Sequence, residues 1–210
     1  MDELNIFENL IIIALSNVNQ SYYQTTYNNI QNFRRALEYR NGRFFNNDFE
    51  RFGERVFCYE FYHQLRILID NERINNPLFL DGALLQAEVE KMQIIELVER
   101  FGLRILRGRM SPDFLMHTPG NANFHPYVIE VKCEHELSSR KLLFDLEKID
   151  QFITRYNYQR GIFLAINVNN ELIQTRIDEI QERINELEGR NRIKIISKTT
   201  QLAEHRVWQL

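Results

Sequence analysis

The segment Gly161–Val168 (GIFLAINV) constrains the fold most, because it is a continuous apolar run of strand length. Such a run is typical of a β-strand buried on both faces, which occurs where helices cover both sides of a parallel sheet. The strand-like segment Tyr127–Cys133 precedes it, and the amphipathic stretch Arg140–Tyr156 lies between the two. The pattern therefore predicts a right-handed β-α-β crossover.

The flanking segments extend this alternation of helix and strand. Helical periodicity predicts helices over Asp48–Asp70, Ala83–Phe101 and Glu171–Leu187. Phe114–Met116 and Arg192–Ser197 are typical of short strands. The order of these elements predicts an α/β fold with a mixed β-sheet core flanked by helices.

The first 45 residues are interpreted as a helical accessory region, and residues 46–210 as the main domain. The apolar segment Ile6–Leu15 should pack on the core or in a dimer interface. Its run Leu10–Leu15 is too short to span a bilayer, and the surrounding Asp2, Glu3 and Glu8 are unlike the basic start of a signal peptide. We therefore expect a cytoplasmic protein without a membrane partner.

Composition excludes little. The net charge of −3 removes the direct argument for nucleic-acid binding that a strongly basic chain would give, but a local basic patch can still bind phosphate. The two cysteines, Cys58 and Cys133, form no CxxC pair, so neither a disulfide framework nor a structural zinc site is expected. Cys133 and His135 alone would supply only two zinc ligands.

The residues that point to chemistry are Asp113, Glu130 and Lys132. Successive side chains of a strand point to opposite faces, so Ile129 and Val131 would face the core while Glu130 and Lys132 lie side by side on the other face. Sixteen residues separate Asp113 from Glu130, enough for two paired strands and a turn. Asp113 can thus lie beside Glu130.

Two carboxylates in one cleft supply the hard oxygen ligands that suit Mg²⁺. A bound Mg²⁺ polarises a phosphoryl oxygen and lowers the pKa of its water. Lys132 would orient that water or stabilise the negative charge that grows on the phosphate. The residue types therefore favour hydrolysis of a phosphodiester.

The order Pro112-Asp113, then Glu130-Val131-Lys132, resembles the PD-(D/E)XK nuclease superfamily, which includes restriction endonucleases and Holliday-junction resolvases. The segments PDFLMHTPG, VIEVKC and DLEK look like a bacterial branch of that superfamily. The resemblance covers roughly residues 48–168. It implies a restriction-endonuclease-like sheet core, to which the first 45 residues add a helical N-terminal extension.

The resemblance also implies roles for the site residues. Asp113 and Glu130 would bind Mg²⁺, for which Mn²⁺ can substitute, and the backbone carbonyl of Val131 would be a third ligand. Lys132 would be the catalytic lysine.

The superfamily places one further acidic residue on a helix before these strands. We favour Glu60 for this position because it lies in the family-like block YEFYHQLR. Glu54 is the alternative, since it continues the Phe57–Phe61 stripe and so would face the core.

Cationic residues around the motif are candidates for phosphate contacts. Arg104, Arg107 and Arg109 lie just before Asp113, and His117 lies four residues after it.

Asp145 and Lys148 follow the motif at an i, i+3 spacing. They could position DNA, but we interpret them as a helix-surface ion pair.

The sequence thus predicts a Mg²⁺-dependent endonuclease that cuts nucleic acid, with DNA favoured over RNA and a role in restriction, defence or repair. A homodimer is compatible with this function, because cleavage of a duplex needs two cuts. The alternative is a catalytically inactive module that keeps the nuclease fold to bind DNA or a protein partner.

Overall fold

The computed structural model describes residues 3–23, 46–72, 82–87, 110–118 and 125–210, and for residues 46–53 it describes the backbone alone. The helices and strands in chain order are α1 (Glu3–Asn17), α2 (Gln20–Tyr23), α4 (Asn46–Glu72), β1 (Leu84–Ala87), β2 (Phe114–His117), β3 (His125–Cys133), α7 (Ser139–Arg155), β4 (Tyr158–Ile166), α8 (Asn170–Glu179), α9 (Gln181–Asn185), the 3₁₀ turn η2 (Arg190–Arg192), β5 (Ile193–Lys198) and β6 (Arg206–Gln209).

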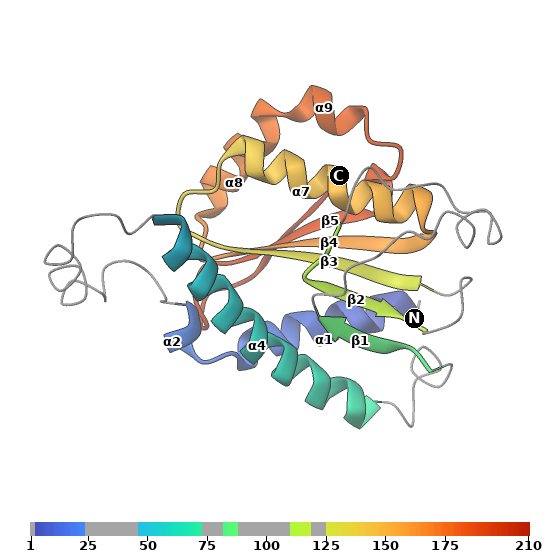
Figure 1. Cartoon of the computed structure of the whole chain (residues 1–210). Helices are drawn as coiled ribbons and strands as arrows, with labels where there is room; N and C mark the ends of the chain where they lie inside the picture. Colours follow the sequence, from blue (N-terminus) through green and yellow to red (C-terminus); the bar gives the residue numbers. More distant parts are fainter. Residues whose placement is uncertain (1–2, 24–45, 73–81, 88–109, 119–124) are drawn as a thin grey trace, which may run out of the picture.

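The strands form one mixed sheet in the order β1-β2-β3-β4-β5-β6. The first three strands pair antiparallel, β3, β4 and β5 pair parallel, and β6 returns antiparallel to β5. Helices α7, α8 and α9 cover one face of the sheet, and α1 and α4 cover the other (Figure 1). The predicted α/β class, a mixed sheet flanked by helices, is confirmed.

Strand β4 joins the two halves of the core. Ile162, Leu164 and Ile166 point into the core shared with α1 and α4. Phe163 and Ala165 point into the second core, under α7, α8 and α9. The apolar run is therefore buried on both faces, as predicted, because each face is covered by helices.

Gly161 in β4 lets helix α7 approach the sheet closely. A Cβ atom at this position would lie 2.1 Å from Cγ2 of Ile149 on α7, far inside van der Waals contact. The glycine thus sets the depth at which α7 lies on the sheet, and α7 carries part of the site described below.

Two predicted elements are wrong in part. Leu84–Ala87, predicted as the start of a helix over Ala83–Phe101, forms strand β1 because it pairs with β2; residues 88–101 lie outside the described residues. The helix predicted over Glu171–Leu187 is divided at Ile180 into α8 and α9. Strand β6 was not predicted, because its sequence RVWQ is partly polar and becomes a strand only by pairing with β5.

The apolar N-terminal segment packs on the sheet, which is one of its two predicted places. Phe7, Leu10 and Leu15 of α1 belong to the same core as β3 and β4. The boundary at residues 45 and 46 stays a prediction. Among the described helices, none is both long and apolar enough to cross a membrane.

A carboxylate fastens α1 to the strands. Glu8 forms ion pairs of 2.8 Å with Arg160 on β4 and 2.6 Å with Lys194 on β5. The hydroxyl of Tyr127 on β3 donates to the carbonyl of Leu4 over 2.6 Å. Helix α1 is therefore held across the parallel strands by polar contacts as well as apolar ones.

Candidate functional site

The site begins where strands β2 and β3 separate. Their pairing ends at Phe114 and Ile129, so the following residues of β3 have no partner on that side among the described strands. Asp113, immediately before β2, accepts a hydrogen bond from the Val131 backbone N–H over 2.7 Å. The carboxylate thus satisfies a donor that the strand pairing leaves open, and it lies beside the part of β3 that carries Glu130 and Lys132.

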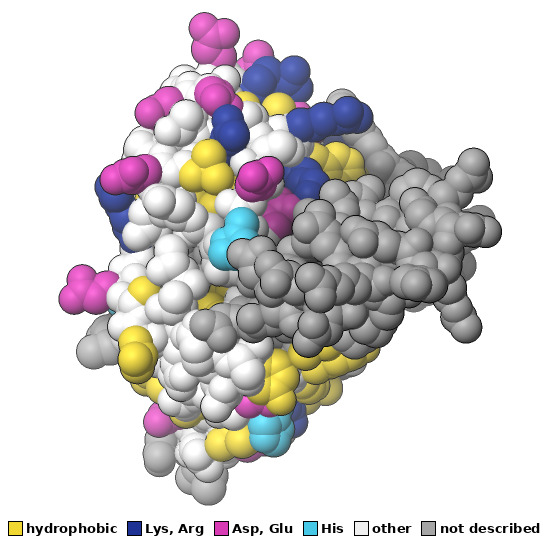
Figure 2. Space-filling model, turned by 90° about the vertical axis from the view of Figure 1, so that its left-hand side faces the viewer, with side chains coloured by type: hydrophobic (Ala, Val, Ile, Leu, Met, Phe, Trp, Pro, Cys, Tyr) yellow, Lys and Arg dark blue, Asp and Glu magenta, His cyan; other side chains and the backbone are white. Residues whose placement is uncertain are grey.

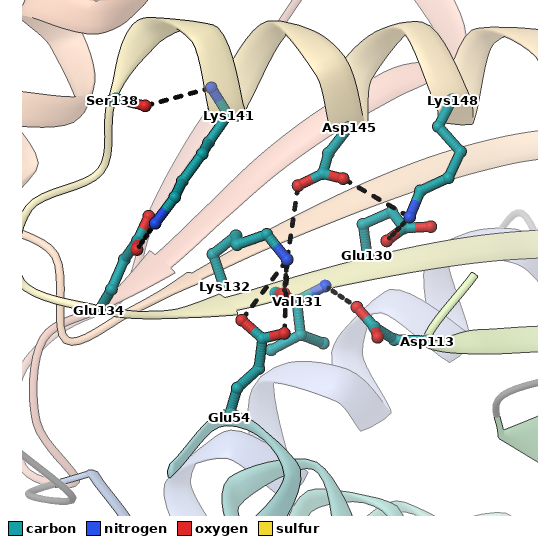
Figure 3. A network of polar contacts seen from close by, with 10 residues as sticks. All are labelled: Glu54, Asp113, Glu130, Val131, Lys132, Glu134, Ser138, Lys141, Asp145 and Lys148. Atoms are coloured by element: carbon teal, nitrogen blue, oxygen red, sulfur yellow. Dashed lines mark hydrogen bonds and ion pairs between the residues drawn. The ribbon is translucent and has the colours of Figure 1, made fainter. Parts of the chain in front are cut away.

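Glu130 points away from the α1 side of the sheet and towards α7. Its side chain is fully buried, and Lys148 Nζ on α7 lies 2.6 Å from Glu130 Oε2 (Figure 3). While Oε2 lies against this ammonium, Glu130 Oε1 has no hydrogen-bond partner among the described residues. A buried carboxylate with free lone pairs has the capacity for a further ligand.

Lys132 connects the two helices that flank the open end of β3. Its Nζ lies 3.4 Å from Glu54 on α4 and 3.6 Å from Asp145 Oδ2 on α7. The same ammonium donates to the Val131 carbonyl over 3.1 Å (Figure 3). Side chains from α4, β3 and α7 therefore meet at this one group.

The interpretation of Asp145 and Lys148 as a surface ion pair is wrong. Their side chains are 4% and 14% exposed, and they lie 3.5 Å apart inside the cluster. The signal was present in the sequence: Leu142, Asp145, Leu146 and Ile149 follow the spacing of one buried helix face. A carboxylate within an apolar stripe needs a buried partner of opposite charge, and the structure supplies two lysines.

The cluster carries more negative than positive groups. Of the described residues it contains four carboxylates, Glu54, Asp113, Glu130 and Asp145, and two ammonium groups, Lys132 and Lys148. If all are ionised, four negative and two positive charges leave a formal balance of −2.

The pKa values follow from this excess of acids. Burial, together with nearby Asp113, raises the pKa of Glu130 well above its usual range, and Lys148 only partly opposes this. Burial also raises the pKa of Asp113, against the opposing Lys132 and the Val131 N–H. Burial raises the pKa of Glu54 to about 7. Protons and cations therefore compete for these carboxylates.

The pKa of Lys132 is raised as well, but by the neighbouring carboxylates and against the effect of burial. Burial alone lowers the pKa of Lys132, but the carboxylates of Asp145, Glu54 and Asp113 outweigh it, so the pKa is raised. Lys132 therefore stays protonated near neutral pH and can act as a donor or a positive charge, not as a base.

Of the two candidate glutamates on α4, the structure brings Glu54 to Lys132. Glu60 instead accepts a hydrogen bond from Gln64 on its own helix over 2.7 Å. Glu54 was passed over because it would face the core, and that orientation is what directs it to Lys132. The geometry thus favours Glu54 over Glu60 as the further acidic residue of the site.

Of the predicted phosphate contacts, the structure describes only His117, and it does not bring that residue to the cluster. His117 lies at the far end of β2 from Asp113, is 7% exposed and contacts Gln86 and His125. Arg104, Arg107 and Arg109 lie outside the described residues, so their assignment stays a prediction.

The chemical types of the available donor atoms suit a hard divalent cation. Asp113 and Glu130 offer carboxylate oxygens and Val131 a carbonyl, the atom types that Mg²⁺ prefers. In the described part of the chain, no three His, Cys, Asp or Glu side chains are already gathered in the geometry of a metal site. The two carboxylates with the free lone pairs of Glu130 fit such an ion, provided that the surrounding ion pairs rearrange.

Comparisons with known proteins found no family model, no curated protein and no solved structure that matches this chain. What the site can do is therefore inferred from its own geometry.

Proposed function

We propose that this protein is a metal-dependent nuclease that hydrolyses phosphodiester bonds, with DNA as its substrate. One observation carries the proposal: among the described residues, the partly buried cluster of four carboxylates and two lysines has a formal balance of −2 when all six groups are ionised, which one divalent cation would neutralise. Leaving such a balance uncompensated away from water is costly. A resident cation therefore gives this arrangement of charges a physical reason.

The order of the elements around the cluster supports the same reading. Helix α4, the antiparallel strands β1 to β3, helix α7 and strand β4 follow one another in the described part of the chain, and α4, β3, α7 and the residue before β2 supply the acids and lysines of the cluster. This is the order that the resemblance to the PD-(D/E)XK superfamily implies. A restriction-endonuclease-like core is accordingly part of the proposal.

The residues would divide the work as follows. Asp113, Glu130 and the Val131 carbonyl would hold the cation, which when bound polarises a phosphoryl oxygen and makes its water more acidic. Lys132 would place its ammonium against the negative charge that develops on the phosphate. Glu54 would fix the direction of Lys132 through the 3.4 Å contact.

The described surface beside the site has no strong excess of positive charge to attract nucleic acid. Figure 2 shows acidic and basic side chains interspersed over the described part of the face at which the parallel strands end. Affinity for nucleic acid is therefore proposed to depend on the bound cation and on Lys132, because the carboxylates alone would repel phosphate. A homodimer, a cytoplasmic location and a role in restriction, defence or repair are further parts of the proposal.

The test is cleavage by the purified full chain. Supercoiled plasmid, linear duplex, branched DNA and RNA would each be incubated with Mg²⁺ or Mn²⁺, and with a chelator. We expect DNA cleavage that needs the metal and falls by about 10²-fold or more in Asp113→Asn and in Lys132→Met. Glu147→Gln is the matched control, because Glu147 lies on α7 but pairs outward with Arg183 over 3.0 Å.

Two results would contradict the proposal. Cleavage that survives both substitutions would come from a contaminating enzyme. A folded protein that binds DNA without cleaving any substrate would instead match the inactive module.

A further inference from the structure

Lys148 is the cation that the structure places against the most deeply buried acid. Its Nζ lies 2.6 Å from Glu130 Oε2, and the Glu130 side chain is 1% exposed. Lys132, the other ammonium of the cluster, is directed to Glu54 and Asp145 instead. Among the described residues, Lys148 is therefore the immediate counter-charge of Glu130.

A second acceptor for Lys148 lies on its own helix. Asp145 Oδ1 is 3.5 Å from Lys148 Nζ, one helical turn before it. The lysine stem has four carbons and flexible torsions, so the ammonium can move from one carboxylate to the other without movement of the backbone. Lys148 is thus between two acids, and the nearer of them is the proposed metal ligand.

We propose that Lys148 neutralises Glu130 in the metal-free protein and is displaced towards Asp145 when a divalent cation binds. The inference rests on the proposed function and adds a residue that sets metal affinity. Displacement is needed because Glu130 has no exposed surface for a second cation to approach while the ammonium stays at Oε2. The lysine supplies the counter-charge of the buried acid before the metal binds, and it weakens the binding of the metal.

The test is calorimetric titration of the metal-free full chain with Mn²⁺, in the wild type and in Lys148→Met. Methionine keeps the length of the side chain and removes its charge. Because a unit charge within a few ångströms strongly opposes a cation in a partly buried site, we expect Mn²⁺ to bind Lys148→Met about tenfold or more tightly than the wild type. The unfolding temperature of the variant should also rise more on addition of Mn²⁺.

Lys141→Met is the matched control. Lys141 lies on the same helix and pairs with Glu134, just beyond β3, over 2.5 Å, but it is outside the cluster. Its loss should leave Mn²⁺ affinity unchanged within about twofold. If Lys148→Met does not fold without metal, Lys148→Gln removes the same charge while keeping a hydrogen-bond donor for Glu130.

The outcomes separate this inference from the proposed function. If the wild type binds Mn²⁺ and neither Lys148 variant binds it more tightly, Lys148 does not compete with the metal and the inference is wrong, while the nuclease proposal stands. If neither the wild type nor the variants bind Mn²⁺, both proposals are wrong.

Discussion

Replacing Glu54 by glutamine should flatten the pH dependence of stability in the metal-free protein. In the folded chain, burial raises the pKa of Glu54 from its ordinary value of 4.5 to about 7. Between these values the folded state binds more protons than the unfolded state. The free energy of unfolding contributed by Glu54 is therefore fully present below pH 4.5 and is lost as the pH rises to 7.

The size of this effect has a ceiling. Each pH unit of the interval corresponds to about 1.4 kcal/mol, so Glu54 can contribute at most about 3.5 kcal/mol. Its side chain is 23% exposed and lies beside Lys132, so solvent screens part of the effect. We expect wild-type stability to fall by roughly 1–2 kcal/mol more than that of Glu54→Gln between pH 5 and pH 8.

Urea unfolding in chelator at the two pH values measures this difference. The raised pKa values of Asp113 and Glu130 act in both proteins, so only the contrast between the wild type and the variant is informative. Glu60→Gln removes a carboxylate from the same helix, away from Lys132, and is the control. Equal pH dependence in the wild type and Glu54→Gln would refute the placement of Glu54 in the buried cluster.

Two predictions concern the parts of the fold that hold the site. Gly161→Ala should lower the free energy of unfolding by about 1–3 kcal/mol, because the added Cβ would meet Ile149. A double-mutant cycle with Ile149→Ala should show coupling between the two positions, and additive effects would contradict the contact. Glu8→Gln should cost about 1–3 kcal/mol in urea unfolding, because Arg160 and Lys194 lose their carboxylate; a loss below about 0.5 kcal/mol would mean that these pairs do not fasten α1.

The sequence predicts those elements whose own pattern of apolar residues indicates which of their faces are buried. Gly161–Val168 needed helices on both sides of it, and β4 has them. The prediction was wrong for β1 because Leu84–Ala87 leads into a stretch with helical spacing, and only pairing with β2 makes this segment a strand. Strand β6, at the other edge of the sheet, was missed because it too becomes a strand only by pairing, here with β5. Edge strands depend on partners distant in sequence, which local periodicity does not contain.

The site shows a similar limit. The alternation of β3 and the distance to Asp113 were enough to expect Asp113, Glu130 and Lys132 near one another. They were not enough to identify the helix charges that join the cluster. The helical spacing indicated that Glu54 faces the core, but it did not show that Lys132 lies at that point of the core. Glu54 and Glu60 lie at different places along α4, and the position of Lys132 on β3 determines that Glu54 is the one that meets it.

A charge on the buried face of a helix is the more informative signal, because it must be neutralised. Asp145 lies in the apolar stripe of α7, so its presence required partners before any motif was considered. Among the described residues, Lys132 and Lys148 supply two positive charges, yet Glu54, Asp113 and Glu130 add three more acids to the same cluster. The remainder can be neutralised by protons, as the raised pKa values indicate, or by a divalent cation. If the nuclease proposal holds, these are competing states of one cluster, and acid would oppose metal binding at the carboxylates that hold the metal.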